Sequence, residues 1–402
     1  MKQAALSEVV DFVSGGTPSK ANDDFWHGTI PWVSPKDMKS EVISATQDWI
    51  TDAAVTHSAT KVVPPGSVLV VARSGILAHT LPVAMTASPT AFNQDVKALL
   101  PHRDVLSPDY LFRVLQAMGP DLVRVGVKKG ATVHSLRSGV LEGLRIPLPS
   151  LPEQRRIAAL LTKQMAAVGK ARAAVQAQLE AAKALTGAYL REVFESEEAG
   201  RWPRRRLGEV AHVSGGIQKS SHRLPVAFHR PYLTVRNVGW GKLDLSSLEH
   251  FEVTPTELER LCLHPGDVLV VEGNGSTGQI GRVAVFRGEI SECIHQNHLI
   301  RVRPNQRELI SDFLFQFLSG PDGRTQLMRA AGTTTGLRTL SVSKIQNLDV
   351  PLPSLESQVD TTNYLGRLAK RLETLQNRLQ EVDSLLDPLG NALLRVTFKG
   401  GL

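Results

Sequence analysis

Cysteine is scarce in this sequence, and long apolar runs are missing. Cys262 and Cys293 are the two cysteines among 402 residues, and neither belongs to a Cys-x-x-Cys pair. That spacing excludes a disulfide framework and a cysteine-based zinc site, and it fits a reducing compartment. No apolar run approaches the ~18 residues needed to span a bilayer, and residues 1–8 contain no apolar signal core. We therefore expect a soluble, cytoplasmic protein that does not contact a membrane.

Catalytic and nucleotide-binding motifs are also missing. Residues 273–278 have the outline of a phosphate-binding loop, but Gln279 and Ile280 stand where lysine and serine or threonine are required. No GxSxG elbow, HExxH pair or Asn-Pro-Pro-Tyr motif occurs in the sequence. His295 and His298 are near each other, but surface or turn roles explain them better than a metal site. These absences favour a binding protein over an enzyme.

Positive charge exceeds negative charge. The sequence has 46 Lys and Arg against 39 Asp and Glu, a formal net charge of +7. Basic clusters gain affinity for nucleic acids because they displace counterions from phosphates. Net charge alone is a weak signal and leaves a solvated basic surface as an equal alternative. The hydrophobic content of 42% is enough for more than one buried core.

The sequence contains an internal repeat of two copies. Residues 6–16, Leu-Ser-Glu-Val-Val-Asp-Phe-Val-Ser-Gly-Gly, return as residues 207–216, Leu-Gly-Glu-Val-Ala-His-Val-Ser-Gly-Gly. Four further pairs follow in the same order, at residues 31–34 and 231–234, 65–71 and 265–271, 146–154 and 350–358, and 190–194 and 394–398. Two copies of one module predict two similar domains related by an internal pseudo-two-fold axis.

Each copy changes character at a Pro-Leu-Pro-Ser-Leu signpost. Before it, short β-branched runs alternate with Gly and Pro, as in domains of mixed strands and turns. After it, the hydrophobic period becomes helical. We predict an α+β fold in which two duplicated mixed α/β domains, residues 1–150 and 199–353, are joined by two long helices, residues 151–198 and 354–402.

The second long helix has the spacing of a coiled coil. Its apolar residues lie alternately three and four positions apart, which is the pattern of an a/d seam. The seam residues are Leu365, Leu368, Leu372, Leu375, Leu379, Val382, Leu386, Leu389 and Leu393. Pro388 interrupts the pattern, and we expect it to kink or restart the helix.

The first long helix has a weaker seam. Leu161, Val168, Val175, Ala182 and Tyr189 repeat every seven residues, and the second seam position holds Gln164, Ala171, Gln178 and Leu185. A single such helix is ordinarily a core helix or a homodimer zipper, but two in one chain favour packing on each other. At ~1.5 Å per residue, residues 153–195 would span roughly 60 to 65 Å, on the order of 18 base pairs of B-DNA.

The acidic residues do not recur as an active site requires. Asp267 and Glu272 loosely suggest a metal nuclease, but Ser67 and Ala72 occupy the matching positions of the first copy. A duplicated active site should keep its metal ligands in both copies. We therefore expect neither a metal site nor a catalytic residue in this chain.

With these features the chain closely resembles the specificity subunit of type I restriction-modification systems. The resemblance covers essentially the whole length and rests on three stretches: residues 15–20, Gly-Gly-Thr-Pro-Ser-Lys; residues 25–32, Phe-Trp-His-Gly-Thr-Ile-Pro-Trp; and the signpost at residues 147–157. The second copy departs mildly, since Gly-Ile-Gln-Lys at residues 216–219 replaces the Gly-Thr-Pro stretch. This departure concerns the shape of one loop.

The resemblance implies a division of labour. Each globular domain would be a target recognition domain for one half of a split site on double-stranded DNA. The two long helices would form an antiparallel coiled coil that sets the gap and docks two modification (methyltransferase) subunits, which carry S-adenosylmethionine and the adenine methylation chemistry. Restriction/translocase subunits would add translocation and cleavage driven by ATP with Mg. The chain itself would be non-catalytic and would hold no cofactor.

The loops supply the candidates for DNA contact. Phosphates are bound by Lys and Arg, and base edges in the major groove by Arg, Lys, Asn and Gln. The candidates are Lys20, Lys36, Arg73, Lys128, Lys129 and Thr132 in the first copy, and Lys219, Arg236, Asn237, Asn274, Thr333 and Arg338 in the second. For each of them a solvated surface residue is the alternative. Gln94 and Gln296 recur in both copies, where a buried structural hydrogen bond is as good an explanation as base contact.

Two other interpretations stay open. A coiled-coil scaffold with protein-binding end domains fits the same helices, and salt-sensitive DNA binding together with a methyltransferase partner would separate it from a recognition subunit. A hydrolase or nuclease fits less well, because the acids do not recur between the copies. Since the frame recurs while the loops differ, a recognition subunit should read two unlike half-sites.

Overall fold

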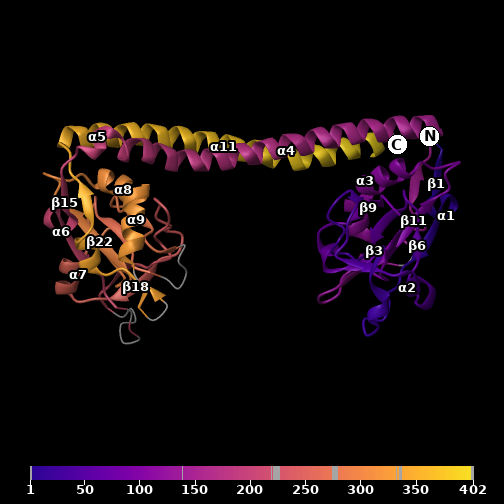
Figure 1. Cartoon of the computed structure of the whole chain (residues 1–402), viewed down its shortest axis with the longest axis horizontal. Helices are drawn as coiled ribbons and strands as arrows, with labels where there is room; N and C mark the ends of the chain where they lie inside the picture. Colours follow the sequence, from indigo (N-terminus) through magenta and orange to yellow (C-terminus); the bar gives the residue numbers. More distant parts are fainter. Residues whose placement is uncertain are drawn as a thin grey trace. The chain divides into compact units, whose positions relative to one another are not determined.

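Figure 1 shows the computed structural model of the chain, coloured along the sequence. The structure describes residues 2–137, 139–218, 220, 227–273, 279–331, 333–334 and 337–399, without the side chains of residues 333, 334, 337, 338 and 399. The chain divides into two compact units. Unit 1 comprises residues 1–176 and 381–402, and unit 2 comprises residues 177–380. Each unit therefore contains a globular part and a portion of both long helices.

The described part of unit 1 is built on two main sheets, with the strand orders β2-β11-β7-β9-β4 and β5-β3-β10-β6. Their strands are β2 (Val10–Ser14), β3 (Trp26–Val33), β4 (Val42–Ile43), β5 (Asp48–Ile50), β6 (Val62–Val63), β7 (Val68–Val71), β9 (Val83–Thr86), β10 (Thr90–Phe92) and β11 (Val96–Pro101). Smaller sheets join β1 (Gln3–Ala5) to β14 (Arg145–Pro147), and β12 (Val127–Lys128) to β13 (His134–Leu136) and β8 (Arg73–Ser74). The apolar run of β7 is buried along its whole length, as its place between two other strands requires.

Helix α3 (Pro108–Gly126) closes the core of unit 1. It begins at Pro108, which suits the first helical position because no N–H group is needed there. Its Leu111, Val114 and Leu115 share one buried cluster with Leu69 of β7. The shorter helices are α1 (Leu6–Val9), η1 (Asp23–Phe25), α2 (Asp52–His57) and η2 (Gly75–Ala78).

The described part of unit 2 repeats this frame, with the strand orders β16-β22-β19-β20 and β18-β17-β21. Their strands are β16 (Ala211–Gly215), β17 (His229–Leu233), β18 (Glu249–Glu252), β19 (Val268–Val271), β20 (Val283–Val285), β21 (Ile294–His295) and β22 (Leu299–Pro304). Smaller sheets join β15 (Arg204–Arg206) to β25 (Asp349–Pro351), and β23 (Thr333–Thr334) to β24 (Leu337–Arg338). The helices are α5 (Glu197–Gly200), α6 (Leu207–Val210), α7 (Pro255–Leu261), α8 (Ser311–Ser319), α9 (Pro321–Ala330) and α10 (Val342–Gln346). The fold of both units is α+β, as predicted.

A close backbone approach explains one glycine of the pair in each copy. A Cβ atom on Gly15 would lie 2.2 Å from the carbonyl oxygen of Phe92, and one on Gly216 would lie 2.1 Å from that of His295. A side chain would collide at both places, so glycine is required. Gly15 therefore corresponds to Gly216, one residue away from the match that the sequence predicts.

The same shift affects the recurring glutamine. The backbone N–H groups of Asn93 and Gln296 each donate, at 2.9 Å, to the last residue of the neighbouring strand, β3 and β17 respectively. Asn93 thus corresponds to Gln296, and the predicted match of Gln94 with Gln296 is wrong. Gln94 corresponds instead to Asn297, and its Oε1 accepts a hydrogen bond from Thr17 at the surface.

A long helix follows each signpost. α4 (Leu151–Phe194) has 44 residues and α11 (Leu355–Lys399) has 45. α11 continues through Pro388, so of the two predicted effects of this proline, a kink or a restart of the helix, the restart is wrong. A proline removes one main-chain hydrogen bond. The carbonyl group that loses its donor belongs to the exposed residue Ser384, where water can replace the bond.

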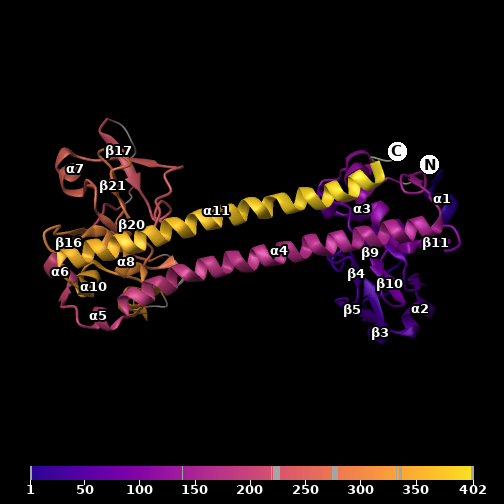
Figure 2. The ribbon, with the colours of Figure 1, turned by 90° about the horizontal axis from the view of Figure 1, so that it is seen from above.

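Within unit 1, the first part of α4 packs antiparallel to the last part of α11 (Figure 2). Leu161 near the start of α4 shares a core with Phe398 near the end of α11. Farther along α4, Arg172 forms an ion pair with Asp387, which lies earlier in α11. The ring of Phe398 also meets Tyr110 of α3 edge-on, with 5.5 Å between the ring centroids. The two helices are therefore part of the core of this unit.

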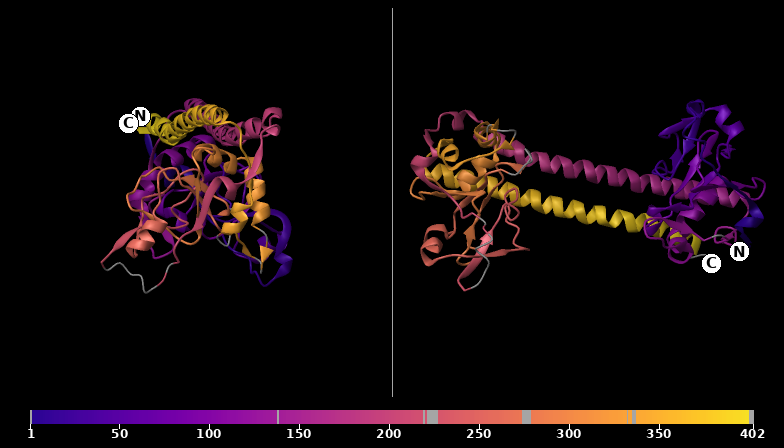
Figure 3. Two further views of the ribbon diagram at one scale, coloured as in Figure 1. Left: turned by 90° about the vertical axis from the view of Figure 1, so that its left-hand side faces the viewer. Right: turned by 90° about the horizontal axis from the view of Figure 1, so that it is seen from below.

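Within unit 2, the last part of α4 packs antiparallel to the first part of α11 (Figure 3). Leu190 of α4 lines a hollow of about 180 Å³ together with Leu365, Leu368 and Leu372 of α11. Phe194, the last residue of α4, packs against α8, where its ring lies 5.5 Å from that of Phe313. Both units thus use the same antiparallel arrangement.

The pairing of α11 uses a different second seam position from the predicted one. Leu365, Leu372 and Leu379 are between 5% and 8% exposed, so the first predicted position faces the partner helix. Leu375 and Val382 are 44% and 45% exposed. Their assignment to the seam is therefore wrong.

α4 shows the same change. Leu161 and Val175 are buried and Val168 is half-buried, so these residues face α11. Ala171 and Leu185, predicted at the second seam position, are exposed. The buried residue Leu179 lies four positions after Val175, rather than three.

Polar contacts between the helices of unit 1 explain the change. Gln176 donates to Asp383 at 3.0 Å, and Arg172 lies 3.8 Å from the same carboxylate. In a seven-residue repeat, the second buried position can lie either three or four residues after the first. These contacts place the partner helix on the side of the residues that lie four positions after the first seam position.

A buried glutamine fixes the start of α4. Gln154 is 0% exposed. Its Oε1 accepts from the backbone N–H of Ser107 at 2.8 Å, and its Nε2 donates to the carbonyl groups of Val105 and Pro149, at 2.9 Å each. The side chain thereby ties the first turn of α4 to the segment before α3.

Gln358 makes the matching bonds at the start of α11. It is also 0% exposed. Its Oε1 accepts from the N–H of Ile310 at 2.9 Å, and its Nε2 donates to the carbonyl groups of Glu308 and Pro353 at 2.8 and 3.0 Å. We call each of these two sets of three bonds a glutamine latch.

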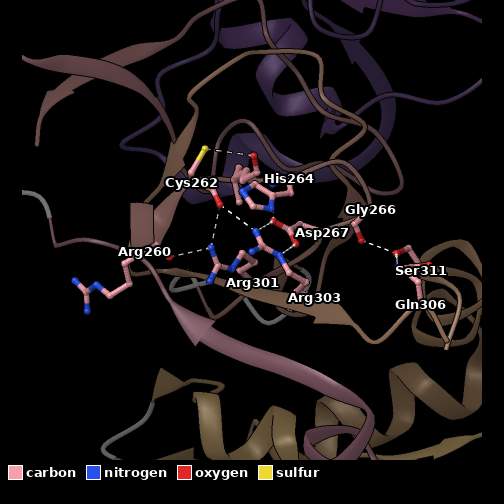
Figure 4. A network of polar contacts seen from close by, with 10 residues as sticks. Arg260, Cys262, His264, Gly266, Asp267, Arg301, Arg303, Gln306 and Ser311 are labelled. Atoms are coloured by element: carbon pink, nitrogen blue, oxygen red, sulfur yellow. Dashed lines mark hydrogen bonds and ion pairs between the residues drawn. The ribbon is translucent and has the colours of Figure 1, made fainter. Parts of the chain in front are cut away.

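A charged network lies inside unit 2 (Figure 4). Asp267, 0% exposed, accepts two hydrogen bonds from Arg303 at 2.6 and 2.7 Å, and one from the N–H of His264 at 2.8 Å. Arg301, also buried, donates to the carbonyl group of Cys262 at 3.1 Å, just beyond the end of α7. The network joins β19, β22 and the end of α7.

Unit 1 has uncharged residues at the positions that correspond to this network. The strand registers match β22 to β11 and β16 to β2. Asp267, Arg301 and Arg303 therefore correspond to Ser67, Ala98 and Leu100. Asp267 is thus part of the framework of unit 2, which explains why the acid is missing from the first copy.

Beside this network, His295 gives unit 2 a pH dependence. Burial lowers the pKa of His295 from about 6.5 to about 4, and the nearby Arg301 acts in the same direction. The unfolded chain therefore binds a proton that the folded chain does not, and stability falls as the pH falls from about 6.5 towards 4. We expect this single group to cost about 3 kcal/mol of unfolding free energy over that interval.

His295→Phe should remove this dependence, because Phe92 occupies the same place in unit 1. The measurement is urea unfolding of the parent and the variant at pH 7 and pH 4.5. The difference between the two proteins should change with pH by about 2 to 3 kcal/mol. An equal pH response of both proteins would contradict the assignment.

Candidate nucleic-acid interface

Two parallel strands of unit 1 end at the same edge of a sheet. β3 and β10 pair in parallel, with Val33 opposite Phe92. Because the C-terminal ends of parallel strands meet at one edge, the loop that follows β3 and the turn that follows β10 leave the sheet together. The first carries the exposed Lys36, and the second carries Asp95.

The end of β7 brings Arg73 to this edge. The backbone N–H groups of Ala72 and Arg73 both donate to the carbonyl group of Asp95, at 2.7 and 3.0 Å. The side chains pair as well, since Nε of Arg73 lies 2.6 Å from Oδ1 of Asp95. The side chain of Arg73 is 57% exposed and that of Asp95 22%, so the acid supports the arginine from the protein side.

A small sheet joins Arg73 to the second basic loop of unit 1. β8 pairs with β13 and β13 with β12, with Arg73 opposite Ser135 and Ser135 opposite Lys128. Residues directly opposite in a sheet share a face, so these three side chains form one row. The turn between β12 and β13 adds the exposed residues Lys129 and Thr132. Two loops that are far apart in the sequence thus form one surface.

Unit 2 has the same strand end with the acidic and the basic side chain exchanged. The N–H of Glu272 donates to the carbonyl group of His298 at 3.0 Å, as Ala72 does to Asp95. Nδ1 of His298 lies 2.9 Å from Oε2 of Glu272. Here the acid lies at the strand end and the basic side chain in the turn, the reverse of Arg73 and Asp95.

The hairpin of β23 and β24 completes this edge in unit 2. The N–H of Leu340 donates to the carbonyl group of Glu272 at 2.8 Å. Thr333 and Arg338 pair in register across the hairpin, and their side chains lie outside the described part of the chain. The candidates Lys219 and Asn274 lie outside the described residues altogether.

The remaining candidates differ in exposure. Lys20 and Arg236 are exposed in loops. Asn237 is 4% exposed, and its amide group donates to the carbonyl groups of Asp244 and Ser247, at 2.8 and 2.9 Å, and accepts from Thr234. These bonds use the side chain to hold its own loop, so the assignment of Asn237 to DNA contact is corrected to a structural role.

A further basic surface was missed at the level of sequence. Arg191 of α4 and Arg324 and Arg329 of α9 line an open hollow of about 650 Å³ in unit 2. The guanidinium group of Arg324 lies over the ring of the exposed Trp240, 4.0 Å from its centroid. These residues come from three separate segments, so only the fold brings them together. Asp95 was missed as well, because its acidic side chain gave no reason to expect it in an anion-binding surface.

The described residues show no metal site, no reactive thiol and no membrane-spanning helix. No three His, Cys, Asp or Glu side chains among them gather as a metal site would require. Burial raises the pKa of Cys293 to about 12, which keeps this thiol protonated and unreactive at neutral pH. None of the described helices combines the length and the apolar character needed to cross a membrane.

The chain is similar to proteins of known family. A specificity subunit of the type I restriction enzyme EcoR124I/EcoR124II from Escherichia coli is 42% identical over 159 residues, which cover 39% of this chain and 39% of that subunit. The chain therefore matches about two fifths of this relative's length.

Two solved structures resemble the whole chain in fold. One is a chain from a structural study of complex assembly and conformational transition of the type I R-M system, with a TM-score of 0.76, 19% identity, and coverage of 100% of this chain and 98% of that one. The other is the HsdS subunit from Thermoanaerobacter tengcongensis, with a TM-score of 0.61, 20% identity, and coverage of 100% and 97%.

The family itself is identified by sequence. A model of the type I restriction modification DNA specificity domain matches residues 1–180 and again residues 199–384. The two matches fall on the two copies of the internal repeat, and together they account for most of the chain. This chain therefore belongs to the family of type I restriction modification DNA specificity domains.

Proposed function

We propose that this chain is the sequence-specific DNA-recognition subunit of a type I restriction-modification complex. Each unit would read one half of a split site on double-stranded DNA. One observation carries the proposal: the same strand end recurs in both units with different side chains, Arg73 and Asp95 in unit 1 against Glu272 and His298 in unit 2. One frame with two sets of exposed polar groups suits the recognition of two unlike half-sites.

Phosphate contacts would surround these positions. Lys36 and Arg236 are exposed basic residues in loops at these edges, and Lys128 is an exposed basic residue of β12. Arg324 and Arg329 add positive charge on α9. Such contacts position the protein on the duplex without reading sequence, and they make binding sensitive to salt.

The chemistry would reside in partner subunits. Two modification subunits would hold S-adenosylmethionine and methylate adenine, and restriction/translocase subunits would use ATP and Mg. The acid that suggested a nuclease, Asp267, is engaged by Arg303 and has a serine counterpart in unit 1. This chain would therefore contribute recognition rather than catalysis.

The long helices would dock the modification subunits. Val382, Leu385 and Leu389, which belong to the part of α11 in unit 1, are between 45% and 67% exposed. Apolar side chains at these spacings form a stripe on the side of α11 that does not face α4. A partner that buries this stripe would gain the free energy of removing it from water.

Methylation mapping tests the proposal. The chain would be expressed with its modification subunit in a host that lacks adenine methylation, and modified positions would be mapped across the genome. We expect one asymmetric motif in two parts separated by a fixed gap. Salt-sensitive DNA binding without any motif would contradict sequence recognition. Binding to partner proteins without DNA binding would favour a coiled-coil scaffold.

Lengthening both long helices should widen the gap. We would insert one seven-residue repeat between Gln176 and Ala177 and another between Gln380 and Glu381, the borders of the two units. Seven residues add about 10 Å of helix, which corresponds to about three base pairs. The motif should keep both halves and gain that spacing. An unchanged gap would show that the helices do not set it.

A further inference from the structure

The ion pair of Arg73 and Asp95 supports one further inference, which rests on the proposed function. The acid engages one side of the guanidinium group, at Nε. Asp95 is itself held, because its other oxygen accepts from Nδ2 of Asn93 at 3.3 Å. Among the described residues, none is bonded to the two terminal nitrogens of Arg73, and its side chain is 57% exposed. The supported arginine therefore presents two parallel donors to the solvent.

Two parallel donors match one base in particular. In the major groove guanine presents two acceptors, N7 and O6, whereas adenine presents an acceptor beside a donor and cytosine presents a donor. Fixing the side chain beforehand also reduces the conformational entropy lost on binding. We propose that Arg73, oriented by Asp95, reads a guanine in the half-site of unit 1.

The same ion pair disfavours a simple phosphate contact. A carboxylate at 2.6 Å offsets much of the positive charge that attracts the arginine to phosphates. It leaves the direction of the terminal N–H groups unchanged, and direction is what base recognition uses. The pair is therefore better suited to specificity than to general affinity.

Unit 2 places a different reader at the equivalent strand end, in the turn that corresponds to the turn of Asp95. Nδ1 of His298 contacts Glu272, and the side chain of His298 is 53% exposed. The second ring nitrogen offers a single hydrogen-bonding group where Arg73 offers two. His298 would thus read a different pattern of base edges, so this strand end makes the two half-sites unlike. Asp95 and Glu272 act as positioning residues for the two readers.

The experiment measures base preference rather than activity alone. The full chain in complex with its modification subunit would be tested as the wild type, Arg73→Ala, Arg73→Gln and Asp95→Asn, by methylation mapping and by competition binding. The competitor duplexes would carry each base in turn at every position of the wild-type motif. Arg124→Ala is the matched control, because Arg124 is an exposed arginine of α3 that also pairs with an aspartate.

The wild type should prefer guanine at one position of one half-site by about tenfold to a hundredfold. Arg73→Ala should reduce that ratio to near one and leave every other position unchanged. Arg73→Gln should shift the preference towards adenine, which glutamine can contact through two bonds. Asp95→Asn should reduce the ratio at the same position, and Arg124→Ala should not change it.

Two results would separate the role of Arg73 from the proposed function. If the wild type yields a split motif and Arg73→Ala keeps the full ratio at every position, Arg73 does not read a base, and the proposed function stands. If the wild-type complex binds DNA without any base preference, the proposed function fails, and the role of Arg73 fails with it. Because the ratio is independent of total affinity, weak binding by a variant still gives an answer.

Replacing His298 tests the corresponding prediction for unit 2. His298→Ala should relax one position in the other half-site, and Glu272→Gln should weaken the preference at that same position. Relaxation in the half-site that Arg73 reads, or no relaxation at all, would contradict the equivalence of the two strand ends.

Discussion

Gln154→Leu should lower the free energy of unfolding of unit 1 by about 4 kcal/mol. The substitution keeps nearly the same volume but removes a side chain that satisfies three buried backbone groups, those of Val105, Ser107 and Pro149. Each buried polar group that loses its partner costs about 1 to 3 kcal/mol. Urea unfolding gives the size of the loss, and hydrogen exchange at the backbone of α3 places it in unit 1.

Gln178→Leu is the matched control, because Gln178 is an exposed glutamine of the same helix. We expect it to change stability by less than about 0.5 kcal/mol. Gln358→Leu should repeat the large loss in unit 2, where the second glutamine latch makes the same three bonds. Equal effects of Gln154→Leu and Gln178→Leu would show that the latch does not stabilise the fold.

Asp267→Ser should destabilise unit 2 by about 3 kcal/mol or more. Asp267 is completely buried and receives two hydrogen bonds from Arg303. Its removal leaves the guanidinium groups of Arg303 and Arg301 beside one another without the intervening negative charge. Urea unfolding of the variant, followed by tryptophan fluorescence, measures the loss.

The first copy shows how the loss can be recovered. Ser67 and Leu100 occupy the positions of Asp267 and Arg303 in unit 1. The double variant Asp267→Ser/Arg303→Leu should regain at least half of the stability lost in the single variant, because it removes the unpaired charge and adds apolar contact. If the double variant lost as much stability as the two single variants together, Asp267 and Arg303 would not act as a coupled pair.

The repeat and the helical periods were sufficient to predict the architecture. The apolar period predicted both long helices, and α4 and α11 begin at the signposts. The side of α11 that faces α4 was not predictable in the same way, since Leu375 and Leu372 are equally apolar. Burial of Leu372 and exposure of Leu375 are decided by the side of α11 on which the partner helix packs.

The candidate interface was predicted in part. The basic loops were identifiable because Arg and Lys cluster beside Gly, but their meeting in one row across β8, β13 and β12 depends on the fold. Asn237 shows that residue type alone does not identify a DNA-contacting residue. An asparagine beside a strand serves equally well as a loop staple or as a base reader, and only its burial separates the two.

The two units differ in whether they are formed by one continuous segment of the chain or by two. Unit 2 is one continuous stretch, whereas unit 1 is completed by residues 381–402. During synthesis, Tyr110 and Leu161 must therefore wait for Phe398 while the ribosome adds the whole of unit 2, a delay of about 10 to 40 seconds. The unit whose synthesis starts first is thus the last to have all of its residues, and its unfinished apolar surface is where a chaperone would be needed.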